Sequence, residues 1–154
     1  MTDRQSWHET LPKKRMGAGA LFLDEQGRLL LVNPTYKPQW EIPGGIVEQD
    51  ESPRQACIRE VQEEIGLVKP VERLLSISYA ATKVNRTEGL MFIFWGGVLT
   101  AKEIAEIRLP AAELSEYRFV TLAEALILLT PSLGERVCRS LEILPTERTL
   151  YLEV

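Results

Sequence analysis

The sequence predicts a single α/β domain of the α+β type, in which helices cover the faces of a mixed β-sheet. Its 154 residues, 45% hydrophobic and 26% charged, have the size and composition of a soluble globular domain. No apolar run approaches the roughly 18 residues that a membrane-spanning helix needs. The expected elements run as strands, one helix, more strands and then helices, which is typical of a mixed sheet and not of an alternating parallel fold.

The N-terminal third predicts an arm followed by a hairpin. We expect residues 1–15 to form a flexible arm and residues 16–154 to form the domain. The apolar run of residues 16–23 predicts a buried strand, and residues 28–32 return as a second strand after a turn that contains Gly27. The prolines that follow end the second strand.

A helix is predicted over residues 53–65. Ser52 is a favoured N-cap residue, and Pro53 occupies the first helical position, where proline fits best. Gly66 then supplies the residue that commonly follows a helix C-terminus.

The remaining elements follow from β-prone and helical runs. Residues 71–80 and 90–99 predict two long strands that pair with each other, and residues 118–120 predict a short strand. Helices are expected at residues 122–129 and 134–143. The tail, residues 146–154, alternates Leu150, Leu152 and Val154, which indicates a strand that either supports a homodimer or closes the chain's own sheet.

The charge balance excludes some partners. With 22 acidic and 18 basic residues, the net charge of −4 gives no basic surface for coating a nucleic acid polymer. The acidity is local, because residues 41–64 hold seven acids and two bases, a net of −5, while the other 130 residues sum to +1. So acidic a segment either spreads into solvent or is neutralised by cations.

The scarce residue types limit the chemistry and the compartment. His8 is the single histidine, so carboxylates must carry acid–base or metal chemistry. Cys57 and Cys138 form no C-x-x-C pair, which favours a reducing compartment. Residues 1–15 lack the apolar core of a signal peptide, so we expect a cytoplasmic protein without a membrane partner.

Three glutamates share one face of the predicted helix. At about 100° per residue, Glu64 lies near 40° and Glu63 near −60° from Glu60. Like charges at this spacing repel each other, whereas hard cations such as Mg²⁺ bind such oxygen clusters. A magnesium site and a solvated helix face are both compatible with these three residues alone.

A wider pattern distinguishes the two interpretations. Its nine positions are Gly45, Glu51 after five residues, then Arg59-Glu60-Val61, Glu63-Glu64 and Gly66-Leu67. This segment resembles a complete Nudix box, and residues 40–45 before it are also similar to many members of that family. One small departure is Asp50, where many members have glycine, and aspartate tolerates such turn conformations better than most residues.

The resemblance implies a fold and an activity. It implies the Nudix fold, an α/β/α sandwich around a mixed sheet, and a metal-dependent hydrolase that cleaves a diphosphate linkage. The implied substrate is a small nucleotide-type compound: a nucleoside triphosphate, a nucleotide sugar, an ADP-ribose-like compound or a dinucleotide. The implied cofactor is Mg²⁺, with Mn²⁺ able to substitute.

The resemblance also implies residue roles. Glu60, Glu63 and Glu64 match the family's metal-binding glutamates, with Glu63 acting on a second ion or through water. The carbonyl of Gly44 or Gly45 is a candidate for completing the metal shell. We expect Arg59 and Glu51 to pair and to hold the loop to the helix.

The general base is a carboxylate, since His8 is poorly placed. Family members use either a box glutamate or a glutamate on a later loop. The later candidates are Glu113 and Glu116, and we favour Glu113, although both are also compatible with solvated loop acids.

Substrate choice depends on residues outside the box. Tyr36, Lys37 and Trp40 flank the expected entrance, and Lys83 and Arg86 lie in a polar loop, so aromatic rings could stack a base and cations could meet phosphate. The rival function is a non-catalytic Nudix-fold module that binds a nucleotide metabolite. An isomerase that uses Cys57 ranks last, since Cys57 lies within the box helix, about 60° from Glu60.

Overall fold

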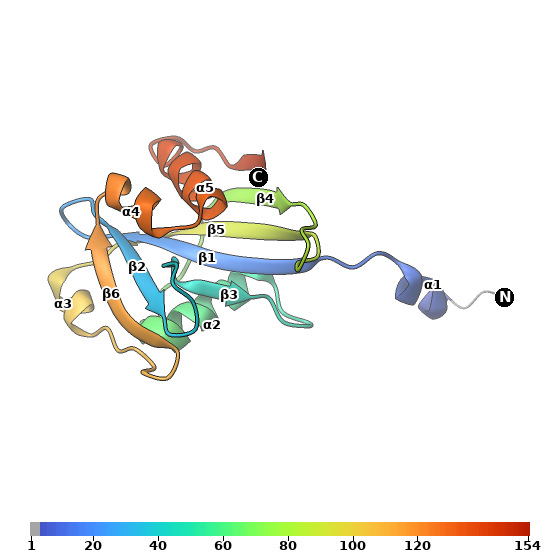
Figure 1. Ribbon diagram of the computed structural model, residues 1–154, viewed down its shortest axis with the longest axis horizontal. Helices are drawn as coiled ribbons and strands as arrows, with labels where there is room; N and C mark the ends of the chain where they lie inside the picture. The colour runs from blue at the N-terminus through green and yellow to red at the C-terminus, as the bar shows by residue number, and fades with distance from the viewer. Residues whose placement is uncertain (1–3) are drawn as a thin grey trace.

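A seven-stranded mixed sheet organises the computed structural model, which describes residues 4–154 (Figure 1). Its strand order is β6-β2-β1-β5-β4-β7, and β3 pairs with β1. The β1–β5 and β4–β7 pairs are parallel and the other pairs are antiparallel. The strands are β1 Arg15–Leu23, β2 Leu29–Pro34, β3 Gly44–Ile46, β4 Leu74–Ala80, β5 Gly89–Val98, β6 Leu114–Val120 and β7 Leu150–Glu153. The helices are α1 Arg4–Thr10, α2 Pro53–Ile65, α3 Ala101–Ala105, α4 Leu122–Leu128 and α5 Pro131–Glu142.

The sheet has a core on each face, so the predicted mixed α/β architecture is confirmed. Alternate side chains of β1 point to opposite faces, as the pleat requires. Ala20 and Phe22 pack with Val61 of α2 in one cluster, whereas Leu21 joins Val137 of α5 in the other. Figure 1 accordingly shows α2 on one face of the sheet, and α4 and α5 on the other. Together these layers form an α/β/α sandwich.

The predicted hairpin is present, but its strands diverge. β1 and β2 meet at the Leu23–Leu29 pair beside the turn. Farther along β2, Val32 instead exchanges two backbone hydrogen bonds with Glu41, at 2.8 and 2.9 Å. The segment after Glu41 then pairs with β1 as β3, which the sequence did not predict. The segment that precedes the box, residues 41–46, is therefore hydrogen-bonded to β2 at Glu41 and to β1 through β3.

Helix α2 has the bounds that the sequence predicted, because its signals are local. Ser52 and Gln55 form a reciprocal capping box, and Gly66 ends the helix in the left-handed region with φ 74°. Asp50 also lies there, with φ 60°, which explains why glycine suits this position.

Other elements differ from their expected bounds. α5 begins at Pro131 and not at residue 134, because Thr130 caps it and Pro131 occupies its first turn. β6 begins at Leu114, four residues before the predicted strand, so the prediction that Glu116 lies in a loop is wrong. α3 was also not predicted; Thr100 caps this short helix.

The first helix and the last strand of the described chain relate differently to the sheet. Within the predicted arm, residues 4–10 form α1, which Figure 1 shows beyond the start of β1 and apart from the sheet. Residues 1–3 of that arm lie outside the described residues. The tail strand β7 pairs in parallel with β4 and closes the chain's own sheet, while a homodimer stays a prediction. Within residues 4–154, every helix is too short or too polar to cross a membrane.

Candidate active site

Two box glutamates of α2 contact the glycines of β3. The Glu64 Oε2 atom accepts a hydrogen bond of 2.9 Å from the backbone N–H of Gly44. The Glu60 carboxylate lies so close to Gly45 that a Cβ atom on Gly45 would be 2.4 Å from the Glu60 Cδ atom. The glycine is required because any side chain there would displace the carboxylate. Pairing of β3 with β1 thus brings the Gly44–Gly45 backbone to the acidic face of α2.

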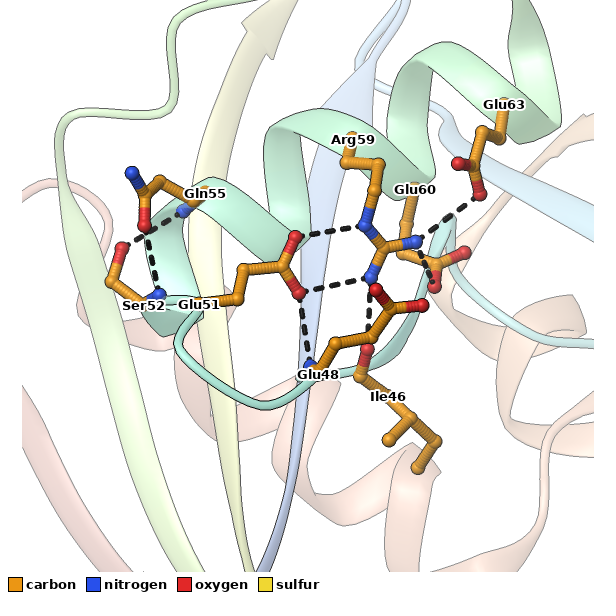
Figure 2. Close-up of polar contacts among 8 residues, drawn as sticks. All are labelled: Ile46, Glu48, Glu51, Ser52, Gln55, Arg59, Glu60 and Glu63. Carbon is orange, nitrogen blue, oxygen red and sulfur yellow. Dashed lines mark hydrogen bonds and ion pairs between the residues drawn. The ribbon is translucent and has the colours of Figure 1, made fainter.

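Arg59 joins the loop to the helix, and Figure 2 shows its contacts. Its guanidinium donates to both oxygens of Glu51, at 2.8 and 3.0 Å, and to the Ile46 carbonyl at 3.0 Å. A further nitrogen donates to Glu60 at 2.8 Å and to Glu63 at 3.2 Å. The expected Arg59–Glu51 pair is therefore present as a bidentate contact, the geometry that most restricts both groups.

The carboxylates of the site are held at high energetic cost in their charged form. The pKa of Glu64 is raised to about 8: burial is the largest cause, the charges of Glu60, Glu41 and Glu113 add to it, and the hydrogen bond from Gly44 opposes it. Burial also raises the pKa of Glu60, although Arg59 counteracts this. A cation at this position would relieve the repulsion.

The donor set fits a hard divalent cation by its chemistry. Glu60 and Glu64 offer carboxylate oxygens, and the adjacent Gly44–Gly45 backbone offers carbonyl oxygens, the ligand type that Mg²⁺ prefers. The side chains are not assembled as a closed cage, since no group of three His, Cys, Asp or Glu residues within residues 4–154 has the spacing to hold an ion. Glu63 is 57% exposed and is turned toward Arg59.

A cleft of about 380 Å³ borders the same two glycines. It lies over the part of β1 that contains Gly17 and Gly19, against which the side chains of Met91 and Ile42 pack. Tyr36 lines the cleft and is 72% exposed. The pKa of Tyr36 is raised by its partial burial and by carboxylates that include Glu64 and Glu113, so the charges of the acidic cluster act on a residue of the cleft. The cleft and the carboxylates thus form one continuous site.

A NUDIX domain family model matches residues 13–139, which is most of the chain. The chain belongs to the NUDIX family. A relative from Mus musculus named diphosphoinositol polyphosphate phosphohydrolase 2 is 36% identical over 95 residues, which cover 61% of this chain and 49% of the relative. The chain thus spans about half the length of such curated relatives.

Solved structures show the same fold. A MutT protein from Methanosarcina mazei Go1 has a TM-score of 0.69 and 26% identity, covering 86% of this chain and 99% of that one. A UDP-X diphosphatase has a TM-score of 0.74 and 20% identity, covering 99% of this chain and 76% of that one. At the latter identity, the likeness concerns the fold alone.

The residues predicted to meet substrate divide into two groups in this NUDIX domain. Tyr36, Lys37 and Arg86 line the cleft. Trp40 does not, because it is 6% exposed, packs in the core and has the Arg118 guanidinium 4.7 Å from its ring centroid. The expected stacking role of Trp40 is therefore wrong. The Lys83 side chain is exposed in the β4–β5 loop and is not part of the cleft lining.

The two base candidates differ in their surroundings. Glu113 precedes β6, is exposed, and lies close enough to Glu64 to raise its pKa. Glu116 lies within β6 and pairs with Arg118 at 2.6 Å. The fold of the NUDIX domain therefore brings Glu113 into electrostatic range of the box, whereas Glu116 is engaged by Arg118.

Two cleft residues were missed by sequence reasoning. Arg15 begins β1, and Arg136 lies on the buried face of α5 next to Val137. A cation on the apolar stripe of a predicted helix was the available signal for Arg136. No local pattern distinguishes Arg15 from the other basic residues that precede β1.

Proposed function

We propose that this NUDIX domain is a metal-dependent pyrophosphohydrolase that cleaves a diphosphate linkage in a small nucleotide-type compound by attack of water on phosphorus. The observation that carries the proposal is the contact of Glu60 and Glu64 with Gly44 and Gly45 beside an open cleft. A diphosphate bound in the cleft at these glycines would lie next to the carboxylate cluster.

The proposed metal ligands are the carboxylates of Glu60 and Glu64 and the carbonyl of Gly45, with Glu63 serving a second ion or acting through water. Bound Mg²⁺, or Mn²⁺ in its place, would neutralise phosphate charge and lower the pKa of a bound water. Supporting this assignment, the pKa of Glu64 is raised to about 8, as expected for a carboxylate placed to face a cation.

Other residues position and activate the reacting groups. Arg59 and Glu51 act as positioning residues, because their bidentate contact fixes the box loop against α2. We assign the general base to Glu113, which would accept the proton of the attacking water. Its support is its place near Glu64 and Tyr36, both of whose pKa values its charge raises.

The proposed substrates share a diphosphate and differ in what it carries. The candidates are a nucleoside triphosphate, a nucleotide sugar, an ADP-ribose-like compound and a dinucleotide. The relatives named above as a diphosphoinositol polyphosphate phosphohydrolase and a UDP-X diphosphatase have in common only the type of linkage in their names. We therefore define the proposed substrate by its diphosphate linkage and not by the group attached to it.

An activity screen tests the proposal. The purified protein with Mg²⁺ or Mn²⁺ is offered each candidate and a diphosphoinositol polyphosphate, and the rate and cleavage position are recorded. Glu64→Gln should abolish turnover, whereas the exposed Glu106 substituted as Glu106→Gln should not. A folded protein inert toward the whole panel contradicts the proposal, and tight binding without turnover favours the rival binding module.

A further inference from the structure

Three arginines from distant segments converge at one end of the cleft. Arg15 begins β1, Arg86 lies in the β4–β5 loop, and Arg136 lies on α5; all three line the cleft. Figure 1 shows the start of β1 beside the β4–β5 loop, in agreement with the pairing of Arg15 with Gly89. Arg136 is 6% exposed, so its charged group is buried within the fold.

Two of these guanidiniums are left without full hydrogen bonding. The buried Nε of Arg136 and the buried Nη2 of Arg15 have no partner within the described part of the chain, residues 4–154. Burial lowers the pKa of Arg136, and the charges of Arg86 and Arg15 lower it further against the weaker opposing effect of Glu135. Buried donors of this kind are normally paired, so their free state here indicates a missing acceptor.

The charge of the cleft also favours an anion. Its lining contains four cations, Arg15, Lys37, Arg86 and Arg136, against the single carboxylate of Glu41. Glu41 is paired with Lys37, which leaves the three arginines uncompensated. Ser132 and Leu133 of the first turn of α5 also line the cleft, and the N-terminal end of this helix adds positive potential there.

This end is separate from the proposed metal site. Along β1, Arg15 is three residues from Ala18, which pairs with Gly45, and four from Gly19, which pairs with Gly44, so about 10–13 Å of strand separates them. The Arg15 side chain does not point back along the strand. Its Nε donates to the Thr87 carbonyl at 2.8 Å, and the guanidinium lies against Gly89. One diphosphate cannot occupy both ends.

We infer that Arg15, Arg86 and Arg136 form a subsite for a phosphate group that the substrate carries beyond its scissile diphosphate. That this phosphate belongs to a substrate rests on the proposed function, but the anion subsite itself follows from the unpartnered Nη2 of Arg15 and Nε of Arg136. A phosphate oxygen would supply the acceptors that Arg15 and Arg136 lack, and its charge would compensate the three cations. Substrates with an additional phosphate are therefore preferred.

Anion binding without metal tests the subsite directly. Tripolyphosphate and inorganic phosphate are titrated calorimetrically into the protein in EDTA, for the wild type, Arg136→Met and Arg15→Met. Each substitution should weaken tripolyphosphate binding by about tenfold or more, because a charged hydrogen bond is lost. Arg139→Met is the matched control, since Arg139 is an exposed arginine of the same helix.

Thermal unfolding separates binding from folding. Without anion, Arg136→Met should melt no lower than the wild type, because it removes a buried guanidinium whose Nε has no partner, and phosphate should stabilise the wild type but not this variant. If Arg136→Met does not fold, Arg86→Met replaces it, since Arg86 is exposed. Equal tripolyphosphate affinity in the wild type and in these variants would overturn the inference.

Matched substrates then test the link to catalysis. NADP⁺ and NAD⁺, and coenzyme A and dephospho-coenzyme A, each share a diphosphate and differ by one phosphate. The wild type should have the higher kcat/KM for the phosphorylated member of a pair, and Arg136→Met should lose that preference; identical ratios in both proteins count against the subsite. Arginine-dependent anion binding without cleavage of any compound would overturn the proposed function and leave the subsite standing.

Discussion

The guanidinium of Arg59 donates two hydrogen bonds to the carboxylate of Glu51, from Nε to Oε1 at 2.8 Å and from Nη2 to Oε2 at 3.0 Å (Figure 2). Glu51 in turn accepts from the backbone N–H of Glu48 at 3.0 Å, so one carboxylate connects the box loop to the helix. Arg59 lowers the pKa of Glu51 by these contacts. Because Arg59 also donates to the Ile46 carbonyl of β3, the strand that contains Gly44 and Gly45 is fixed to the helix that carries Glu60 and Glu64.

Loss of the bidentate Arg59–Glu51 contact should reduce activity more than stability. We expect Arg59→Lys to lower kcat by about 10- to 100-fold, as for other residues that orient metal ligands. Lysine keeps the charge but cannot make the bidentate contact, so the free energy of unfolding should fall by only about 1–2 kcal/mol. Steady-state kinetics and urea unfolding measure both, with Arg139→Met as the surface control. Unfolding that accounts for the whole loss of kcat would show that Arg59 is merely structural.

The raised pKa of Glu64 predicts a pH-dependent stability in the absence of metal. The pKa is about 8 in the folded protein and near the ordinary 4.5 in the unfolded chain, so between these values the folded state binds more protons. The free energy of unfolding should therefore fall as pH rises from about 5 to 8. In EDTA, the stability of the wild type relative to Glu64→Gln should decrease over this range. A difference that stays constant with pH contradicts the prediction.

A methyl group at Gly45 should disable the site without unfolding the domain. The added Cβ of Gly45→Ala would lie 2.4 Å from the Glu60 carboxyl carbon and would force that carboxylate to move. Displacement of a reacting group by about 1 Å can cost about 100-fold in rate, so kcat should fall by that order. The control is Gly134→Ala in α5, whose Cβ would meet only a Leu126 methyl carbon, at 3.1 Å. Circular dichroism monitors folding, and full activity of Gly45→Ala would refute the proposed position of Glu60.

The assignment of the base predicts different results for two neighbouring glutamates. Glu113→Gln should lower kcat by about 10²- to 10⁴-fold, which is typical of a lost general base. Glu116→Gln should leave kcat nearly unchanged, because Glu116 pairs with Arg118 within β6. If neither substitution lowers kcat, the base is a box glutamate.

Local signals explain what the sequence predicted well. Ser52, Pro53 and Gly66 act on backbone groups within a few residues of themselves, so the bounds of α2 follow from the sequence. The positions of Glu60 and Glu64 on one face follow from helical geometry in the same way. The family, and with it the sandwich fold, followed from the spacing of the box and is shown by the NUDIX domain match.

The cleft depended on contacts that are remote in sequence. β3 pairs with β1 where β2 has diverged from it, and Trp40 packs in the core beside α4, whose Leu128 carbonyl accepts a hydrogen bond from the Trp40 N–H. Neither event has a local signal. For the same reason, Glu116 was predicted to lie in a loop, since its strand is defined by pairing with β2.

The sequence by itself determined the acidic helix face, because helix caps and helical periodicity act over a few residues. Only the tertiary structure decided that Arg15, Arg86 and Arg136 meet at the far end of the same cleft. They come from a strand, a loop and a helix whose positions are set by the sheet and by the two cores on its faces. A domain with an acidic sequence thus presents a cationic cleft, because long-range packing, and not local composition, determines which charges face one another.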